Sequence, residues 1–282
     1  MAIVVNTNVQ SIKVQNNLNN VTSAMEKAME RMSTGAKINS AADDAAGLVI
    51  SKGIEVQTNG TLVAKSNAQT GVNLLQTAEG NLDVIQDNLM RVRDLTLQAM
   101  NGGQTDTELG AMQKEVQARL DEIDRLAKGS KFNNFDLFKG ATNSVTLQIG
   151  TGSDSDNNTI TISDVFIDAN ASALTGAAKS TFAFSTTKSR SDYETMLTNV
   201  DSAITKVSER RGTIGSVSNR LESAMASLDT QYENLSAAGS RITDADIATE
   251  SSNYTQNSIL QQASAALLVQ ANQAPNVALT LI

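Results

Sequence analysis

The 282-residue sequence lacks cysteine, histidine and tryptophan, and it contains a single proline, Pro275. Without histidine and cysteine it can build neither a Ser-His-Asp or Cys-His nucleophile nor the usual zinc ligand sets. No disulfide framework can form, so stability must come from burial or from assembly. Aromatic residues make up only 3% of the chain, which is too few to fill a thick core.

Charge and hydropathy exclude further classes. The net charge of −8 and the lack of a basic patch argue against nucleic acid as a partner. No apolar run approaches the roughly 20 residues that span a bilayer, so no membrane partner is expected. Residues 1–20 carry one basic residue, Lys13, and lack the apolar stretch of a cleavable signal peptide. Taken alone, these features predict a cytoplasmic protein.

A first helix is predicted over about residues 7–32. Its apolar residues recur at alternating steps of four and three, which is the spacing of one helical stripe. Thr7 and Gln10 have the spacing of a capping box at its start, and Ser33-Thr34-Gly35 ends it. The stripe consists of Val14, Leu18, Val21, Met25, Ala28 and Met32.

A very long helix is predicted from the capping pair Ser40 and Asp43 to about Met100. Roughly 56 helical residues would extend about 80 Å, so this helix needs a partner along its length. The segment 101–103, Asn-Gly-Gly, ends it, and a further capping box at 105–108 starts a shorter helix. The heptad positions of the long helix are Leu75, Ala78, Leu82, Ile85, Leu89, Val92, Thr96 and Ala99, and the stripe of the shorter one is Leu109, Met112, Val116, Leu120 and Ile123.

The middle of the chain, from Phe132 to about Ser185, is rich in Gly, Asn, Ser and Thr. Residues 145–149 and 159–162 alternate apolar with polar side chains, and a turn-rich cluster separates them. This pattern predicts a β-hairpin with a long loop. Phe182 and Phe184 suggest a short third strand.

Helix returns at a predicted capping box of Ser191 and Glu194 and is expected to break at Gly239 and Thr243. Arg211 and Ser218 interrupt its apolar repeat. That repeat is Leu197, Val200, Ile204, Val207, Ile214, Leu221, Met225, Leu228, Tyr232 and Leu235, and a last stripe follows at Leu260, Ala263 and Leu267.

The chain is therefore arranged as a mirror: short helix, long helix, β-rich middle, long helix, short helix. We expect a mainly α fold, a long antiparallel helical coiled-coil rod built from both chain termini, with a small β-hairpin region in the middle. The terminal stripes are narrow and flanked by Asn, Gln, Ser and Thr, so the terminal helices should be marginal until other surfaces cover them. Such segments are suited to assembly into a polymer.

Several motifs resemble those of a known family and follow one another in the same order along the chain. The stretch Arg31–Leu48, RMSTGAKINSAADDAAGL, resembles the N-terminal signature of bacterial flagellins. The string at 91–95, Asn219–Glu222, Glu233–Ala238 and the tail Leu268–Pro275 follow in the order of that family, and together the matches cover both terminal regions. The resemblance implies an inner helical domain from residues 1–42 and 240–282, and a rod from 43–190 and 191–239. It also implies a short flagellin without large outer domains.

The resemblance further implies a function and partners. The chain is expected to be a secreted, non-enzymatic subunit of the bacterial flagellar filament, exported by the flagellar type III pathway without cleavage. Expected partners are other copies of itself, an export chaperone at Ala245–Ile282, and the filament cap and junction proteins; no cofactor or metal is expected. The alternatives are a hook-filament junction protein and a secreted coiled-coil adhesin or ligand.

Two sites follow from the same resemblance. Arg91, Leu95 and Glu115 match positions bound by the vertebrate Toll-like flagellin receptor; the alternative interpretation, which is compatible with this one, is that Arg91 and Arg93 are solvated charges in exposed ion pairs on a rod helix. Residues 30–51 resemble the peptide sensed by plant flagellin receptors. In that peptide Gly35, Asp43, Asp44 and Gly47 also have ordinary roles at a helix break and a helix start.

Two seams follow from the stripes. The expected polymerisation seam is Val14, Leu18, Val21, Met25, Leu260, Ala263 and Leu267, and the expected rod seam is Leu82, Ile85, Leu89, Val92, Leu221, Leu228 and Leu235. Asp154–Asn158 resembles a calcium loop only superficially, because Thr159 and Val165 stand where an EF-hand needs Gly and Glu, and it reads as a turn. Asp43 and Asp44 are adjacent and do not face each other on a helix. No catalytic constellation remains.

Overall fold

The computed structural model describes residues 7–140 and 143–279. The chain divides into two compact units. Unit 1 comprises residues 1–58 and 233–282, and unit 2 comprises residues 59–232. Two long helices, α2 (Ala45–Ala99) and α6 (Arg190–Thr243), contribute residues to both units. The mainly helical fold predicted from the sequence is confirmed.

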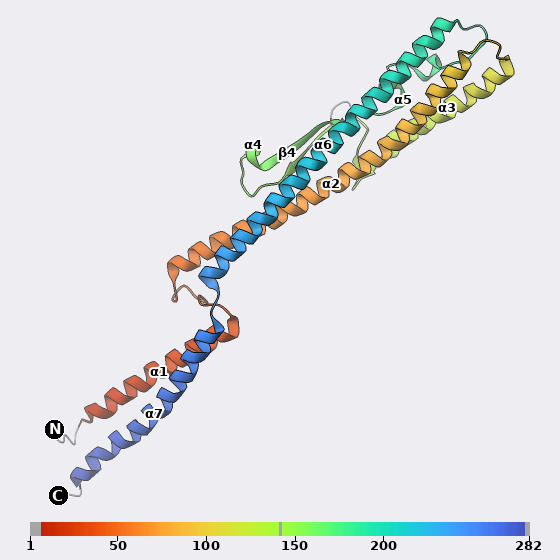
Figure 1. The fold of residues 1–282 in the computed structure, drawn as a ribbon. Helices are drawn as coiled ribbons and strands as arrows, with labels where there is room; N and C mark the ends of the chain where they lie inside the picture. Colours follow the sequence, from red (N-terminus) through yellow and green to blue (C-terminus); the bar gives the residue numbers. More distant parts are fainter. Residues whose placement is uncertain (1–6, 141–142, 280–282) are drawn as a thin grey trace. The chain divides into compact units, whose positions relative to one another are not determined.

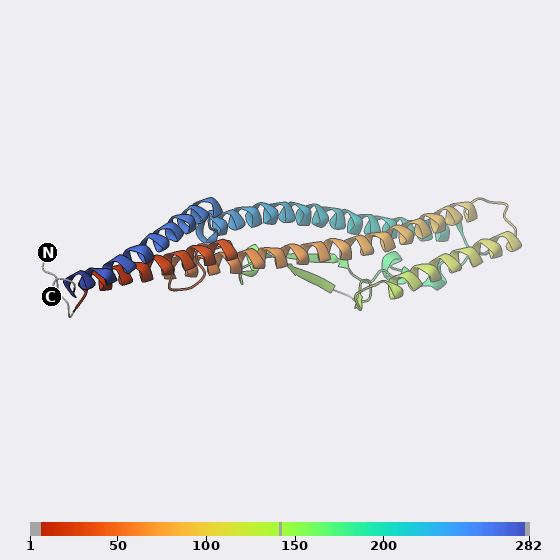
Figure 2. The same ribbon diagram turned by 90° about the horizontal axis from the view of Figure 1, so that it is seen from below.

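Unit 2 is a helical bundle in which α2, α6 and α3 (Asp106–Gly129) run side by side (Figures 1 and 2). Every predicted heptad position of α2 from Leu75 to Ala99 is buried. On α6 the buried positions include Val200, Val207, Ile214 and Leu221, whereas Tyr232, which the repeat included, is exposed. The rod residues Leu82, Ile85, Leu89, Val92, Leu221 and Leu228 are buried, and Leu235, in unit 1, is half-buried.

Local capping decides where the helices of unit 2 begin. The Thr105–Glu108 capping box is present at the start of α3, as predicted. The box predicted at Ser191 and Glu194 is wrong. Ser189 and Asp192 make the reciprocal bonds instead, and Glu194 pairs with Arg190 one turn earlier. The sequence offers Ser followed three residues later by an acidic residue in two frames, and the earlier frame forms the cap.

The middle of the chain packs on the bundle as two small antiparallel hairpins. Strand β3 (Asn143–Gln148) pairs with β4 (Thr159–Phe166), which confirms the predicted hairpin. The turn-rich cluster between them contains a single helical turn, α4 (Ser155–Asn158), capped by Asp154. Strands β1 (Lys131–Phe132) and β2 (Phe135–Asp136) form a second hairpin that was not predicted, because two-residue strands carry no periodic signal.

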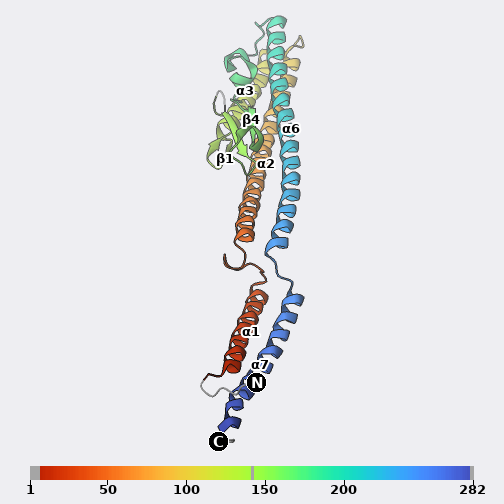
Figure 3. The same ribbon diagram turned by 90° about the vertical axis from the view of Figure 1, so that its left-hand side faces the viewer.

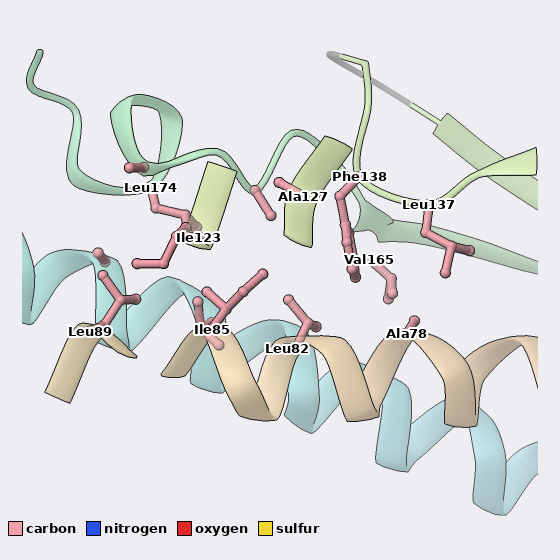
Figure 4. Close-up of a cluster of buried hydrophobic side chains, with 14 of the residues drawn as sticks. Ala78, Leu82, Ile85, Leu89, Ile123, Ala127, Leu137, Phe138, Val165 and Leu174 are labelled. Atoms are coloured by element: carbon pink, nitrogen blue, oxygen red, sulfur yellow. The ribbon is translucent and has the colours of Figure 1, made fainter. Parts of the chain in front are cut away.

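The segment after β4 closes the core without a third strand. It forms α5 (Ala171–Thr175) and a 3₁₀ turn at Lys179–Thr181, so the strand suggested at Phe182 and Phe184 is wrong. Both rings are nevertheless buried in the core. Figure 4 shows Leu137, Phe138, Val165 and Leu174 of this middle region meeting residues of α2 and α3. The irregular chain therefore caps one side of the helical core.

Unit 1 contains α1 (Val9–Thr34) packed against α7 (Ile247–Leu279), as Figure 3 shows. It also holds the first residues of α2 and the last of α6. The predicted break at Gly239 is wrong, because α6 continues to Thr243. A Cβ at Gly239 would lie 3.5 Å from the Ile54 side chain, an ordinary contact distance, so the helix continues there without needing glycine.

Candidate functional site

The candidate site is the surface of the paired terminal helices, and its first feature is a polar seam. Helices α1 and α7 run antiparallel, and side chains along their length join them. Ser11 Oγ donates to Asn272 Oδ1 at 2.7 Å, and Gln261 Nε2 donates to Thr22 Oγ1 at 3.2 Å. Asn8 Nδ2 donates to the carbonyl of Ala271 at 2.8 Å. Each neutral bond of this kind contributes about 0.5–1.5 kcal/mol, so the pairing is directional but weak.

Asn8 also starts helix α1. Its side-chain oxygen accepts from the Ser11 amide at 3.1 Å, so Asn8 is the N-cap and the box predicted at Thr7 and Gln10 is wrong. Thr7 and Asn8 are adjacent, and both are residue types that cap helices, so the spacing rule alone could not choose between them. The cap side chain thus serves twice, once in α1 and once against α7.

The apolar stripe of α1 faces α7 only in part. Val14, Leu18, Val21 and Met25 are half-buried, and Ala28 is the buried member of the stripe. The opposite flank of α1 leaves Val9 and Ile12 about half exposed. A half-covered stripe keeps apolar area in water that a further surface could bury.

Helix α7 does not turn its apolar stripe toward α1. Leu260 and Leu267 are 42% and 55% exposed, and Ala263 is exposed as well. Between Glu250 and Gln273 the half-buried residues are instead Tyr254, Asn257, Ser258, Gln261, Ser264, Leu268 and Ala271. Ile259 and Val269 add to the uncovered apolar area, at 61% and 60% exposure. The predicted residues on α7 therefore point away from α1.

The spacing could not reveal this orientation because α7 carries apolar residues on several sides. The signal that could have found it is the row of Asn, Gln and Ser residues opposite the polar residues of α1. An open groove of about 490 Å³ runs along the uncovered side, lined by Ser251, Ser252, Thr255, Gln256, Ile259 and Leu260. No residue after Glu250 is charged. The uncovered side of α7 is thus an uncharged mixture of apolar and small polar groups.

The linkers next to this helix pair are tied together. The amide of Lys37 donates to the carbonyl of Thr243 at 2.6 Å, and the amide of Ala245 donates to the carbonyl of Gly35 at 2.9 Å. Gly35 ends α1 with φ +70°, a left-handed conformation that glycine adopts without strain. Arg31 Nη1 lies 3.1 Å from Glu250 Oε1, and both side chains are largely covered.

Asp43 and Asp44, which precede α2, have different structural roles. Asp43 accepts hydrogen bonds from the Ser40 amide and hydroxyl and lies 2.6 Å from Lys27 Nζ. Lys27, and then Ser40, hold the pKa of Asp43 far below its usual range. Asp44 accepts from the Gly47 amide at 2.9 Å and starts α2, so the predicted Ser40–Asp43 cap is wrong and forms a separate turn.

Gly47 has a packing reason as well. A Cβ there would clash with the Asp44 carboxylate and with Ile38. The structure therefore brings Gly35, Asp43, Asp44 and Gly47 into one linker and helix start, where each has a local structural role. Whether a plant receptor reads them stays a prediction.

The second predicted immune site lies in unit 2. Arg91 Nε and Nη2 pair with the two carboxylate oxygens of Glu115 at 2.8 and 3.2 Å, across α2 and α3. Arg91 lowers the pKa of Glu115, and Glu115 raises that of Arg91. Both side chains remain partly exposed, whereas Leu95 is 2% exposed and belongs to the core. Only the ion pair is open to a partner.

Residues 7–140 and 143–279 contain no group of three or more acidic side chains that could hold a metal ion. Asp154, in the loop that superficially resembled a calcium site, caps α4 by accepting from the Asp156 amide. None of the described helices is long and apolar enough to cross a membrane.

Comparison with known proteins agrees with this architecture. Residues 5–143 match the bacterial flagellin N-terminal helical region, and residues 197–282 match the bacterial flagellin C-terminal helical region. A flagellin from Bacillus subtilis (strain 168) is 38% identical over 302 aligned residues, covering 99% of each chain. A flagellin from Halalkalibacterium halodurans is 36% identical over 280 residues, covering 99% of this chain and all of the relative.

The chain belongs to the bacterial flagellin family. It is a short flagellin, a structural subunit of the extracellular flagellar filament, as the sequence predicted. Among solved structures, a putative flagellar hook-associated protein from Vibrio parahaemolyticus matches with a TM-score of 0.60 at 17% identity, over 72% of this chain and all of that one. That likeness shows the fold alone. The near full-length flagellin matches do not favour the alternative of a hook-filament junction protein.

Proposed function

We propose that the uncovered side of α7, with the half-covered stripe of α1, is the surface through which this flagellin meets other copies of itself in the filament. The seam would consist of Val14, Leu18, Val21, Met25, Leu260, Ala263 and Leu267, as predicted from the sequence. The observation that carries the proposal is the outward orientation of Leu260 and Leu267. Leu260 and Leu267 are about half exposed, so covering each one contributes roughly half of the 1.5–3 kcal/mol of a full burial.

The charge distribution supports copies of the same chain as the occupant. The chain carries a net charge of −8, so two copies repel each other in general. Helix α7 is uncharged after Glu250, and α1 has only Lys13 between its N-cap and Met25. Contact through this side avoids placing like charges opposite each other. Its Ser, Thr, Asn and Gln residues can pair with one another or with water.

The division into an inner helical domain of residues 1–42 and 240–282 and a rod of residues 43–190 and 191–239 belongs to the same proposal. The linkers near residues 35–44 and 243–246 interrupt the helices close to these bounds, and the closed core begins further along α2 and α6, in unit 2. Residues 1–6, 141–142 and 280–282 of these domains lie outside the described part. The role proposed is purely structural, without catalysis.

Other partners would use the same uncovered side before and after assembly. We place the export chaperone on Ala245–Ile282, since a groove that covers the uncovered side of α7 prevents that side from pairing elsewhere. The filament cap and junction proteins would contact terminal helices in the same way. We also propose that the chain is exported through the flagellar type III pathway.

Host recognition is proposed at two places. A vertebrate receptor would contact the Arg91–Glu115 pair, and Leu95 would support that pair from the core. A plant receptor would read the segment with Gly35, Asp43, Asp44 and Gly47. Exposed charges favour the first site, and the compact hydrogen-bonded turn favours the second.

The assembly proposal is tested with the double variant Leu260→Ser/Leu267→Ser. Seeded elongation, followed by electron microscopy and light scattering, should slow at least about tenfold, because two buried leucines would be lost at each contact. The control is Val84→Ser, which removes a comparably exposed apolar side chain from unit 2. Filaments growing at the normal rate from the double variant, with a normal circular dichroism spectrum, would contradict the proposal.

A further inference from the structure

We propose that the side-chain amide of Asn101, which is followed by Gly102, is a site of spontaneous deamidation, a covalent modification of this flagellin that its fold permits at one Asn-Gly pair and suppresses at another. The sequence contains two such pairs, Asn59-Gly60 and Asn101-Gly102. In each pair, the amide nitrogen that would attack the asparagine belongs to the glycine, and no side chain on that glycine shields it. The two pairs are therefore equal in local sequence chemistry and differ in their structural setting.

Asn101 and Gly102 lie in the connection between α2 and α3. Both residues are exposed, and the following Gly103 has φ +100°. Within the described part of the chain the Gly102 amide donates no hydrogen bond, and an added Cβ at Gly102 would meet nothing within 4 Å. The Asn101 side chain can therefore turn toward this amide without breaking a contact, because the loop backbone is not held by a ladder.

The reaction balances with water as the only co-reactant. The amide nitrogen of Gly102, after losing its proton to solvent base, attacks Cγ of Asn101. The new C–N bond closes a succinimide ring, and the Cγ–Nδ2 bond breaks as ammonia leaves with a proton. Water then opens the ring at either carbonyl and gives aspartate or isoaspartate. The net change is hydrolysis of one side-chain amide, and no electron is transferred.

The product carboxylate would form in an open setting. Asn101 and Gly102 line an open cavity of about 360 Å³ together with Lys188 and Arg190. Arg190 pairs with Glu194 and Lys188 donates to the carbonyl of Thr181, so both cations already have partners. The backbone change is also local, since isoaspartate would lengthen the connection before the Thr105–Glu108 capping box and not the helices themselves.

The setting of Asn59-Gly60 opposes the same reaction. Both residues lie in the interior of α2, where the Gly60 amide belongs to the helical hydrogen-bond ladder. A Cβ at Gly60 would clash with the Thr151 side chain, so the loop of the β3–β4 hairpin covers this point of the helix. Attack on Asn59 requires the helix to open and the loop to leave, and both steps cost free energy.

The test follows both peptides by mass spectrometry during incubation of the intact protein at mildly alkaline pH. Asn101 should convert at least about tenfold faster than Asn59, since only Asn59 requires prior local opening. In urea, where the fold is lost, the two rates should become similar. Equal rates in the folded protein, or a ratio that persists unchanged in urea, would overturn the inference.

The matched variant is Gly102→Ala. The position has open space for a Cβ and no positive φ, so the variant should fold normally, with an unchanged circular dichroism spectrum. Conversion at Asn101 should fall several-fold, because the methyl group shields the attacking nitrogen, and conversion at Asn59 should stay the same. An unchanged rate at Asn101 in this variant would exclude attack by the Gly102 amide.

Discussion

Units 1 and 2 are built from the same kind of helix and differ in what the helices bury. Unit 2 closes a continuous core in which α2, α3 and α6 meet the rings of Phe138, Phe166 and Phe182. In the described part of unit 1 only Ala28 and Ile38 are buried apolar residues. Unit 1 is joined mainly by hydrogen bonds, ion pairs and half-covered stripes. Unit 2 thus has a closed apolar core of its own, whereas unit 1 leaves much of its apolar surface uncovered.

The difference follows from what each seam contains. In unit 2 most heptad positions are Leu, Ile or Val, which bury a large area when two helices meet. In unit 1 the side chains between α1 and α7 include Gln261, Ser264 and Asn257, whose burial returns little free energy beyond the bonds they form. An apolar side that is withheld from the intramolecular pair remains for another copy. Under the proposed assembly, this uncovered side of unit 1 is where another copy would bind.

The largest expected effect is a difference in the stability of the monomer between the variants Leu89→Ala and Leu267→Ala. Leu89 is fully buried in unit 2, so its truncation should lower the free energy of unfolding of the monomer by about 2–5 kcal/mol. Leu267 is 55% exposed, so the same truncation should change monomer stability by no more than about 0.5 kcal/mol. Urea denaturation of monomers measures both. Comparable losses for the two variants would mean that unit 1 has a closed core.

An effect of medium size is expected at two glycines of α2 in unit 2, where substitution by alanine should change stability in opposite directions. A Cβ at Gly71 would clash with Leu147 of β3 and contact Leu221 of α6, so Gly71→Ala should cost about 1–3 kcal/mol. A Cβ at Gly80 meets nothing within 4 Å, so Gly80→Ala should stabilise by about 0.5–1 kcal/mol through helix propensity. Thermal unfolding of both variants checks this. Two shifts in the same direction would contradict the close docking of the hairpin on α2.

The sequence was enough to predict the rod and the family, and the reason is physical. Leu75 to Ala99 repeat every seven residues, and a strict repeat leaves one orientation for burial. The stripe of α7 was found, but its direction was not, because several sides of that helix are apolar and the choice depends on the polar partners in α1. Frame errors at Ser191 and Thr7 arose because neighbouring Ser, Thr and Asn residues can each satisfy the same cap. Leu95 shows that a family motif does not reveal which of its residues are exposed.

The smallest expected effect concerns the turn at Asp43 in unit 1. Lys27 and Ser40 lower the pKa of Asp43, so its contribution to the turn is present above the ordinary aspartate value of about 3.9 and is lost as the pH falls below it. Titration of the carboxyl by NMR should show Asp43 ionising at a lower pH than an ordinary aspartate. In Lys27→Met the midpoint should rise toward the ordinary value, because the first cause of the shift is removed. A normal midpoint in the unaltered chain would show that the Lys27–Asp43 contact does not persist in solution, and that unit 1 is even more open than its ion pairs indicate.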